Sequence, residues 1–325
     1  MQAKKRLKRD SMDRFHLFPP QAATSSHEVD ALFFALILIS LFFIAVVFLP
    51  ILFFCIKYRQ GSPADRSNPS SGSNLIELGW TTVPTLMGLT LFAWGAVDYF
   101  RIERKPDNAI DVQVVGKQWM WKIQHAEGRR EINELHLPVD RPVALSLTSQ
   151  DVIHSFFVPA FRVKQDVVPG KYTSEWFKPT RTGEYHIFCS QYCGTQHAQM
   201  IGRVVVMEPQ AYERWLKSGE QTESIVRAGE RLFHERGCSG CHAPNSKLHA
   251  PLLEGLYRKP VPLSDGTMVT ADDQYLRDSI LQPAKQISAG YDNIMPSYAG
   301  HLSEEEIMAL IAYLKSIGTQ EPAAQ

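Results

Sequence analysis

The chain has 325 residues, with 34 basic and 34 acidic side chains and a formal net charge of zero. This length exceeds that of one small domain, and the neutral balance gives no support to a nucleic-acid partner. Two long apolar runs near the N-terminus divide the chain further.

These apolar runs predict a membrane hairpin within residues 29–98. The first run, Ala31–Ile56, carries no charged residue and is long enough to span a bilayer, although Pro50 interrupts it. The second run, Leu78–Val97, is less apolar, so we expect it to pack against other helices. A cleaved signal peptide is the alternative for the first run, but the run exceeds a usual signal core and lacks a small-residue cleavage site.

Short alternating segments after the hairpin predict a β-rich domain. Val143, Leu145 and Leu147 alternate with small or polar residues, as in a half-buried strand. Further ranges that favour strands, separated by Gly and Pro turns, are Asp111–Ile123, Glu184–Phe188 and Arg203–Met207. Many short strands with such breaks indicate a β-sandwich or barrel, which we expect over residues 99–208.

The densest chemistry lies in the twelve-residue segment from Cys189 to Met200. Cys193, His197 and Met200 have the spacing of a loop around one copper ion, because thiolate and imidazole bind copper and a thioether is the usual weak axial ligand. The additional Cys189, four residues before Cys193, allows two thiolates to bridge two copper ions. The alternative is a disulfide between the two cysteines, with His197 and Met200 as bystanders.

A second motif, Cys238-Ser239-Gly240-Cys241-His242, is a C-x-x-C-H sequence of the kind that attaches a c-type haem covalently. The two thiols add to the haem vinyl groups, and the adjacent imidazole ligates the iron. The alternatives are a redox dithiol and half of a zinc site, but the sequence downstream offers no second C-x-x-C pair. Cys55 lies in the first apolar run, so no cysteine is left for a structural disulfide.

Two predicted helices flank the C-x-x-C-H sequence. Ile225–Glu235 carries apolar residues at helical spacing, and Ser303–Glu306 is a capping box that opens a second helix. The arrangement resembles the small class I cytochromes c, in which the distal iron ligand is a Met shortly before the last helix. The resemblance implies Met295 as this ligand, and a His/Met pair would raise the haem potential. The rival candidates are Met268, Met308 and His249, although a Met inside a helix more often packs in a core.

The copper loop resembles that of subunit II of the haem-copper cytochrome c oxidases, whose dinuclear copper site is called CuA. The resemblance implies a cupredoxin-like domain and a second imidazole from Val152–Pro159, where His154 matches the family's first ligand. It also implies a copper ligand from the main-chain carbonyl of Gln191. The family usually has Glu at this position, and the Glu side chain helps to hold a magnesium ion. This chain therefore departs from the family at the magnesium ligand, whereas the carbonyl ligand to copper is retained.

Three further positions match the same family. Gly116–Trp121 resembles the aromatic patch through which electrons enter, with Trp119 at the position of the family's tryptophan and Trp121 two residues on; a half-buried aromatic on a strand is the alternative. Glu77 begins a segment like the start of the family's second membrane helix, where the Glu lies at the mouth of a proton channel of subunit I. An interfacial polar anchor is the alternative for Glu77. Asp166 matches a residue near the subunit interface.

Together the resemblances imply a multidomain membrane protein with a two-helix transmembrane hairpin, an all-β cupredoxin-like Greek-key domain and an all-α cytochrome c domain. The implied function is that of subunit II of a bacterial cytochrome c oxidase. It would pass electrons from one covalent haem c to two copper ions and on to the O2-reducing site of subunit I, coupled to proton translocation. The implied partners are subunits I and III and a donor such as a cytochrome c or a quinol–cytochrome c reductase. We expect an N-terminal segment at 1–28, the hairpin at 29–98, the copper domain at 99–208, a linker at 209–222, the cytochrome domain at 223–319 and a tail at 320–325.

Orientation in the membrane depends on where translation starts. In this family haem attachment and copper loading occur on the outer side, which implies the periplasmic face of the bacterial inner membrane. The basic cluster Lys4–Arg9 would instead hold the N-terminus, and with two spans the remainder, inside. Translation from Met12 would leave only Arg14 before the first span, against three basic residues in the loop, Lys57, Arg59 and Arg66. We therefore expect Met12 to be the true start, and N-terminal sequencing that finds the first eleven residues intact would contradict this.

Two other function classes remain open on the sequence. A CuA-containing nitric oxide reductase would use the same relay with different gas chemistry, because the gas binds on another chain. A membrane-tethered copper chaperone or free-standing electron carrier would be non-enzymatic. A chaperone would need exposed, exchangeable ligands and would have no use for an aromatic patch or for Glu77 at a helix start.

Overall fold

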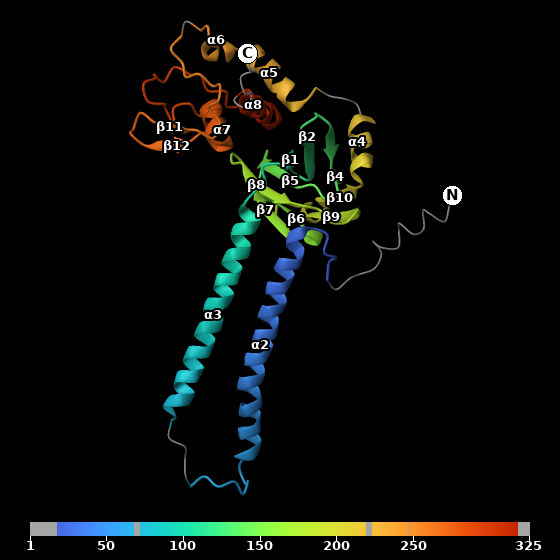
Figure 1. Cartoon of the computed structure of the whole chain (residues 1–325), viewed down its shortest axis with the longest axis vertical. Helices are drawn as coiled ribbons and strands as arrows, with labels where there is room; N and C mark the ends of the chain where they lie inside the picture. The colour runs from blue at the N-terminus through green and yellow to red at the C-terminus, as the bar shows by residue number, and fades with distance from the viewer. Residues whose placement is uncertain (1–17, 68–71, 219–222, 247, 318–325) are drawn as a thin grey trace, which may run out of the picture.

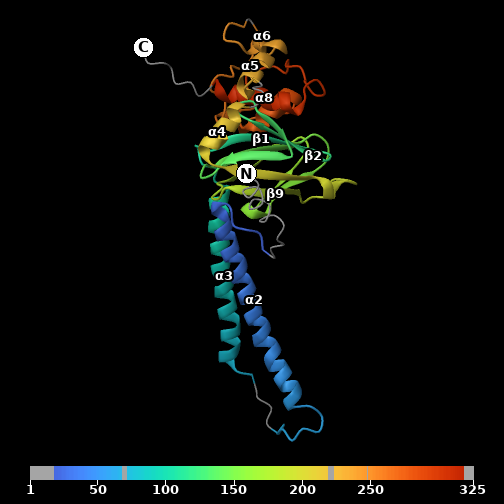
Figure 2. The same ribbon diagram turned by 90° about the vertical axis from the view of Figure 1, so that its right-hand side faces the viewer.

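The structure is a computed structural model that describes residues 18–67, 72–218, 223–246 and 248–317. Two long helices project from one side of a β-sandwich, and a helical domain covers the opposite side (Figures 1 and 2). The three-part architecture predicted from the sequence is therefore confirmed. Met12 and the basic cluster Lys4–Arg9, on which the predicted orientation depends, lie outside the described residues.

The hairpin consists of α2 (Thr24–Lys57) and α3 (Asn74–Glu103). Both helices are long and apolar enough to cross a membrane, and the apolar window of each is exposed along its whole length. This exposure distinguishes them from the core helices of a soluble protein, because lipid can solvate an apolar surface that water cannot. Pro50 does not end α2, which continues for two further turns.

The two residues just before α2, Ala22 and Ala23, belong to the β-sandwich, although the sequence predicted a separate N-terminal segment over 1–28. Ala22 and Ala23 are buried in the sandwich core. The backbone of Ala22 donates to the Ala160 carbonyl at 2.9 Å and accepts from the Thr180 amide at 2.9 Å. These contacts join residues that are far apart in sequence, so local patterning gave no signal for them.

A buried ion pair fixes the sandwich to the first membrane helix. The Arg162 guanidinium donates to both carboxylate oxygens of Asp30 in α2, at 2.7 and 2.9 Å, and also to the Pro19 carbonyl at 2.8 Å. Only 10% of the Arg162 side chain and 5% of the Asp30 side chain are exposed. A two-pronged pair of this kind sets an orientation as well as a distance. The sandwich therefore cannot turn freely above the membrane.

Replacing Arg162 with alanine should lower the free energy of unfolding of the sandwich by about 3–5 kcal/mol, because the Asp30 charge would remain buried without its partner. Denaturant unfolding of the full chain in detergent, followed by tryptophan fluorescence, measures this. The control is Arg203→Ala, which removes an exposed pair with Glu134 and should cost at most about 1 kcal/mol. Equal losses in the two variants would contradict the anchoring role of Arg162.

Two five-stranded sheets form the predicted all-β sandwich, and the strand order within each is not sequential. β1 pairs in parallel with β5, and β4 pairs in parallel with β10, so the chain must cross between the sheets. The inner faces meet in a core that contains Trp121, Phe156 and Phe161. The first sheet is ordered β3 (Arg130–Ile132), β2 (Met120–His125), β1 (Ile110–Lys117), β5 (Val143–Ser149) and β8 (Thr173–Phe177). The second is ordered β4 (Glu134–Pro138), β10 (Ile201–Met207), β9 (Gly183–Cys189), β6 (His154–Val158) and β7 (Val163–Val167), and the short 3-10 helix η1 (Pro159–Phe161) joins β6 to β7.

The single strand predicted over Asp111–Ile123 is wrong, because the structure divides it into the hairpin β1–β2. Lys117 pairs with Met120, so Gln118 and Trp119 form a tight turn between the two strands. The residues on both sides of the turn are apolar enough to continue one strand pattern, and neither turn residue is a Gly or Pro. The turn matters because it carries Trp119 to the end of the sandwich where the copper loop lies.

Part of the predicted linker over 209–222 is a helix, α4 (Pro209–Ser218), that packs on the sandwich. Tyr212 is buried, and its hydroxyl lies 3.1 Å from Nδ1 of the buried His125. The Trp215 ring stacks on His136, with 4.4 Å between ring centroids. The chain is therefore held to the copper domain up to α4, which shortens the connection to the cytochrome domain.

The cytochrome domain confirms the two predicted helices, α5 (Ile225–Glu235) and α8 (Glu304–Ser316), and the capping box between Ser303 and Glu306. α5 and α8 cross at Gly229, where a Cβ atom would stand only 2.0 Å from the Ala309 carbonyl oxygen. Only glycine allows this crossing. The remaining elements are α6 (Ser239–His242), α7 (Asp273–Leu281) and the small hairpin β11 (Pro260–Pro262) and β12 (Met268–Thr270).

Candidate metal centres

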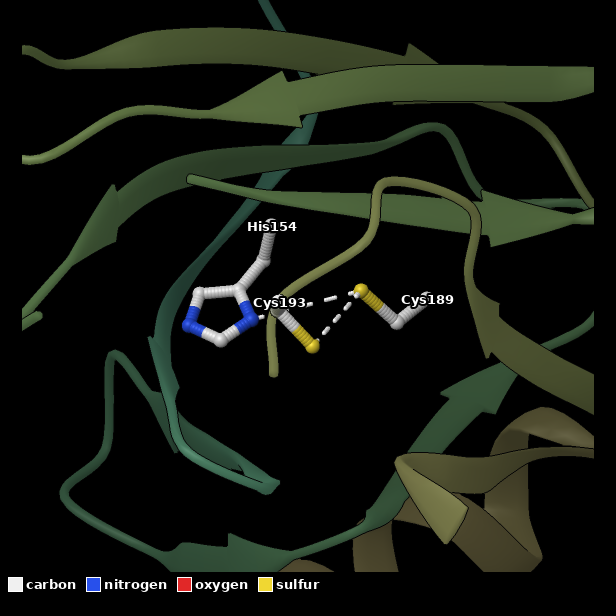
Figure 3. Close-up of side chains that lie close together, drawn as sticks. All are labelled: His154, Cys189 and Cys193. Atoms are coloured by element: carbon white, nitrogen blue, oxygen red, sulfur yellow. Dashed lines mark hydrogen bonds between the residues drawn. The ribbon is translucent and has the colours of Figure 1, made fainter. Parts of the chain in front are cut away.

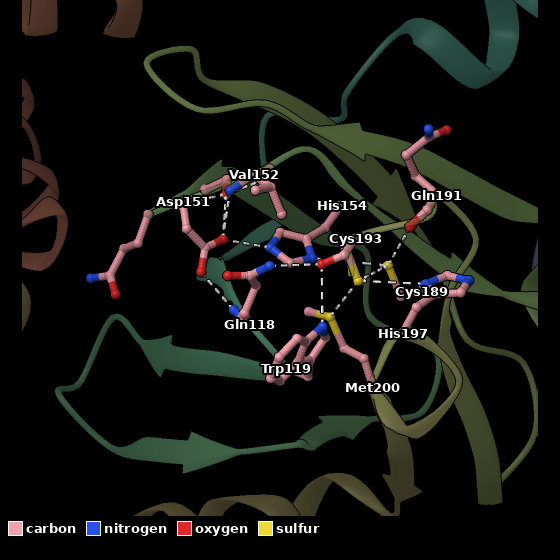
Figure 4. Close-up of polar contacts among 12 residues, drawn as sticks. Gln118, Trp119, Asp151, Val152, His154, Cys189, Gln191, Cys193, His197 and Met200 are labelled. Atoms are coloured by element: carbon pink, nitrogen blue, oxygen red, sulfur yellow. Dashed lines mark hydrogen bonds and ion pairs between the residues drawn. The ribbon is translucent and has the colours of Figure 1, made fainter. Parts of the chain in front are cut away.

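The predicted copper ligands come together at one end of the sandwich, from elements that are far apart in sequence (Figure 4). His154 is the first residue of β6, and Cys189 is the last residue of the neighbouring strand β9. The loop after β9 supplies Cys193 and then the short 3-10 helix η2 (His197–Gln199), and Met200 follows before β10. Two adjacent strands and one loop therefore position the whole donor set.

The two cysteine sulfurs are free thiols 3.7 Å apart, so the structure does not contain the disulfide that was the alternative (Figure 3). Cys189 Sγ lies 4.0 Å from His154 Nδ1 and 3.2 Å from the Gln191 carbonyl oxygen. Cys193 Sγ lies 3.4 Å from His197 Nδ1 and 3.9 Å from Met200 Sδ. The four other predicted donors therefore lie around the pair of sulfurs, two beside each.

The chemistry of the donor set fits copper. Thiolate, imidazole and thioether together are the set that copper prefers. His154, Cys189, Cys193 and Met200 are buried and His197 is half-buried, so the cluster is shielded from water. The Gln191 side chain is exposed, and only its main-chain carbonyl faces the cysteines.

The electrostatics of the thiols also suit a cation. Burial opposes ionisation of Cys189, but its contact with His154, together with backbone hydrogen bonds, lowers the pKa of its thiol to about 6. Burial and the neighbouring Cys189 raise the pKa of Cys193 to about 12. Two thiolates this close repel each other, so a cation between them is what allows both to be ionised.

Two residues that the sequence did not single out hold the cluster in place. Asp151 Oδ1 accepts from His154 Nε2 at 2.8 Å, which leaves Nδ1 directed at the sulfurs. Asp151 Oδ2 accepts from the Gln118 amide at 2.7 Å, and Gln118 Nε2 donates to the Cys193 carbonyl at 2.9 Å. Although burial alone would raise it, hydrogen bonds from Gln118 and His154 hold the pKa of Asp151 below its ordinary value. A carboxylate behind a metal-binding imidazole is a usual support, and its position three residues before His154 was the signal available in the sequence.

Replacing Asp151 with alanine should weaken copper binding about 10–100-fold, because the His154 ring loses the partner that sets its tautomer and orientation. Competition against a chelator of known copper affinity, with the full chain, measures the effect. Asp107→Ala, in the exposed turn before β1, serves as control and should leave copper affinity unchanged. An unchanged affinity in Asp151→Ala would show that the strand geometry alone orients His154.

The two tryptophans expected in an aromatic patch differ in their surroundings. Trp119 is half-buried over the copper loop and donates from Nε1 to the Cys193 carbonyl at 3.2 Å. Trp121 is fully buried, with its ring centroid 5.9 Å from that of His154 and 5.2 Å from that of Phe156. Trp121 therefore offers no surface to a partner, whereas Trp119 keeps part of its surface accessible.

The second cluster lines a cavity of about 320 Å³ in the cytochrome domain. Cys238, Cys241 and His242 lie on one side of it, around the four-residue helix α6, and Met295 lies in the loop before α8. The other lining residues are mainly apolar, among them Leu253, Leu256, Ile280, Leu310 and Leu314. An apolar cavity with two thiols, an imidazole and a thioether at its wall fits a covalently attached haem.

The orientation of His242 suits an iron ligand. Its Nδ1 lies 2.8 Å from the Pro251 carbonyl oxygen, and a carbonyl can only accept, so Nδ1 carries the proton. The neutral ring therefore presents an unprotonated Nε2 as its metal donor. This contact fixes the tautomer, as second partners of ligating histidines generally do.

The structure favours Met295 over its rivals. Met268 is exposed on β12 and Met308 is buried in α8, and neither lines the cavity. His249 does line the cavity, but it is exposed, with Nε2 3.2 Å from the Gly290 carbonyl oxygen and its ring stacked on Tyr291. Among these four candidates, Met295 alone is a cavity-lining residue without a competing polar partner.

Two residues expected to lie near other subunits belong to neither cluster. Glu77 is exposed in the first turn of α3, at the end of the hairpin remote from the sandwich (Figure 1). Asp166, on β7, accepts from the Ser155 hydroxyl at 2.7 Å, and this bond holds the pKa of Asp166 below its ordinary value. Ser155 follows His154 in the sequence, so Asp166 lies one residue from the copper cluster.

Comparisons with known proteins find two family matches and several similar proteins. The family described as "Cytochrome C oxidase subunit II, periplasmic domain" matches residues 129–208, and the family described as "Cytochrome c" matches residues 226–318. The chain is 30% identical over 292 residues to a cytochrome c oxidase subunit 2 of Alkalihalophilus pseudofirmus, across 85% of this chain and 83% of that protein. It is 29% identical over 279 residues to cytochrome c oxidase subunit 2 of Thermostichus vulcanus, across 68% of this chain and 85% of that protein. The crystal structure of the periplasmic domain of subunit II of cytochrome oxidase of Bradyrhizobium japonicum matches at 30% identity and a TM-score of 0.34, across 35% of this chain and 96% of that chain.

The two long apolar helices, the cupredoxin-like sandwich with its sulfur and imidazole cluster, and the helical C-x-x-C-H domain define a membrane-anchored protein with copper-binding and c-type cytochrome domains. The chain belongs to the cytochrome c oxidase subunit II family, in the form that carries a C-terminal cytochrome c domain.

Proposed function

We propose that this chain is the electron-transfer subunit of a respiratory cytochrome c oxidase. One covalent haem c, bound by Cys238 and Cys241 with His242 and Met295 on the iron, would receive electrons. A dinuclear copper centre would pass them on to the O2-reducing site, which lies on subunit I. The observation that carries the proposal is that two imidazoles, a thioether and a carbonyl lie around two buried thiols that are themselves 3.7 Å apart.

The copper ligands in this proposal are His154, Cys189, Cys193, His197, Met200 and the carbonyl of Gln191. Copper supplies a one-electron carrier at this position. The chain contributes the donor set and the hydrogen bonds that keep it in position. Asp151 orients His154, and Gln118 and Trp119 both donate to the Cys193 carbonyl. A rigid, buried donor set changes little on oxidation or reduction, which keeps electron transfer fast.

Fusion of the cytochrome domain to the copper domain supports electron transfer from haem to copper. A tethered haem domain has an effective concentration at the copper domain of roughly millimolar or more, without any additional contact. The donor to this haem would be a cytochrome c or a quinol–cytochrome c reductase. The His/Met ligand pair favours a high haem potential, which suits donation to an oxidase.

The assembly would lie in the bacterial inner membrane, with two spans and with the copper and haem domains on the periplasmic side. Subunits I and III would be the membrane partners, and α2 and α3 offer exposed apolar surfaces for them. Proton translocation would belong to the whole oxidase, with Glu77 at the mouth of a channel of subunit I. The Arg162–Asp30 pair supports this arrangement because it fixes the copper domain relative to the membrane helix.

A nitric oxide reductase with the same relay is the second candidate, because in both enzymes the gas would bind on another chain. The chaperone alternative is disfavoured by geometry. Its ligands would need to be exposed for exchange, whereas His154, Cys189, Cys193 and Met200 are buried.

The test is the copper-to-haem ratio of the full chain in detergent, together with its electron paramagnetic resonance spectrum. We expect two coppers per haem, with one unpaired electron shared equally by both nuclei. One localised copper ion, or none, would contradict the proposal. Purification with its membrane partners, followed by O2 and NO consumption assays, then separates the oxidase from the reductase.

A further inference from the structure

Three polar side chains join the cytochrome domain to the copper domain in a closed ring. Lys122 Nζ, on β2, donates to Glu305 Oε1 at 2.9 Å and to Gln150 Oε1 at 3.1 Å. Gln150 Nε2, at the end of β5, donates to Glu305 Oε2 at 2.9 Å. Glu305 lies in the first turn of α8. Both carboxylate oxygens and both ends of the amide are therefore satisfied across the domain boundary, and we call Lys122, Gln150 and Glu305 the Glu305 ring.

The Glu305 ring contains an ion pair that is partly shielded from water. The Lys122 and Glu305 side chains are 32% and 27% exposed. Burial alone would raise the pKa of Glu305, but the hydrogen bond from Lys122 holds it below its ordinary value. Charge-assisted hydrogen bonds in such surroundings are stronger than exposed ion pairs, which contribute little.

A second contact places an aromatic side chain of the copper domain inside the cytochrome domain. Tyr172, in the loop before β8, packs against the buried core of the cytochrome domain. Its amide donates to Gln274 Oε1 on α7 at 3.0 Å, and the Arg277 guanidinium lies 5.7 Å from its ring centroid. Its hydroxyl is buried without a hydrogen-bond partner in the part of the chain that the structure describes. An inserted aromatic residue is the typical anchor of a stable interface.

Two helices of the cytochrome domain, α7 and α8, contact the copper domain and also line the haem cavity. α8 presents Leu310 and Leu314 to the cavity, while Glu305 enters the ring and the Met308 carbonyl accepts from Gln113 of β1 at 3.3 Å. On the other side of the boundary, Gln150 immediately precedes Asp151, which holds His154. Glu305 on α8 is therefore linked through Gln150 to Asp151, the residue that orients the predicted copper ligand His154.

We propose that the Glu305 ring and Tyr172 dock the cytochrome domain on the copper domain in one fixed orientation, and that Glu305 is a positioning residue for electron transfer between haem and copper. The dock is a property of the chain itself, whereas its role in electron transfer rests on the function proposed above. If the cytochrome domain moved away from the copper domain, the aromatic side chain of Tyr172 would be exposed to water. The hydrogen bonds of the Glu305 ring would also break. Both effects cost free energy and therefore oppose such motion.

Orientation is tested without any activity measurement. Spin-label amino acids introduced at the exposed positions Thr182 and Glu254 report the distance between the two domains of the full chain in detergent. We expect a single narrow distance distribution, and a broad one when Tyr172→Ala is combined with Glu305→Ala. If that variant folds poorly, Tyr172→Ala with Lys122→Met opens the same interface from the copper-domain side. A broad distribution in the parent chain, or a narrow one after the interface is opened, would overturn the dock.

Two matched controls separate the interface from general effects. Tyr172→Phe keeps the ring and removes only the unpartnered hydroxyl, so the distribution should stay narrow. Glu235→Ala removes an exposed glutamate that pairs with Arg231 within α5, and it should also have no effect. Broadening in either control would count against the proposed contacts.

The role in electron transfer is tested with both centres loaded, by photoreduction of the haem and detection of copper reduction. In the parent chain the rate should not depend on solvent viscosity. In the opened variant it should fall at least about tenfold and become viscosity-dependent, because a docking step would precede transfer. An unchanged rate in the opened variant would overturn the positioning role of Glu305. If no electron reaches copper in a parent chain with a narrow distance distribution, the proposed function fails while the dock stands.

Discussion

Replacing Cys189 with serine should reduce copper binding from two ions per chain to one at most, with loss of the spectrum of an electron shared by two nuclei. A serine oxygen does not bridge copper ions as a thiolate does, and Cys193 alone cannot hold both ions. The remaining Cys193, His197 and Met200 still resemble a single-copper loop, so one localised ion is the expected product. Metal analysis and electron paramagnetic resonance of the full chain measure both effects.

Cys55→Ser is the matched control for this variant. Cys55 is an exposed thiol in α2, far along the chain from the donor cluster, and its loss should leave both copper ions in place. If Cys189→Ser still holds two ions with an evenly shared electron, the bridging role of its sulfur is wrong.

The second large effect is expected at the haem. Met295→Ala should retain the covalent haem but lower its reduction potential, on the order of 100 mV, within the ~0.8 V range that axial ligands span. The reason is that a thioether favours the reduced iron, while water or another donor in its place does not. Redox titration of the full chain, followed in the visible haem bands, gives the shift.

Met268→Ala is the appropriate comparison, because Met268 is exposed on β12 and does not line the cavity. The haem reduction potential of the Met268→Ala variant should match that of the parent chain. A shift in Met268→Ala with none in Met295→Ala would move the axial ligand to the β11–β12 hairpin and revise the orientation proposed for the haem.

Predictions from contiguous motifs agreed well with the structure. The segment Cys189–Met200 already contained most of the predicted copper donors, and the structure brings His154 to them through the pairing of β6 with β9. The capping box at Ser303 and the helix Ile225–Glu235 were equally local, because capping and helical spacing involve residues within a few positions of each other.

The errors share one physical origin. One strand was predicted where the structure has two strands joined by a turn at Gln118–Trp119. A linker was predicted where the structure has the helix α4. In both places, contacts with residues far away in the sequence determine the local structure. The Gln118 amide donates to Asp151, and the buried Tyr212 lies beside His125. Propensity and alternation do not register partners that are tens of residues away.

By itself, the sequence determined the chemistry of this protein: which sulfur, imidazole and thioether groups are present, how closely they follow one another, and that two apolar runs can cross a membrane. Only the tertiary structure decided how these parts are held relative to one another. The Asp30–Arg162 anchor, the Asp151 support of His154 and the Glu305 ring join residues on different elements or in different domains. Ligand chemistry is a property of residue types at short spacing, whereas orientation depends on long-range contacts that exist only after the chain has folded.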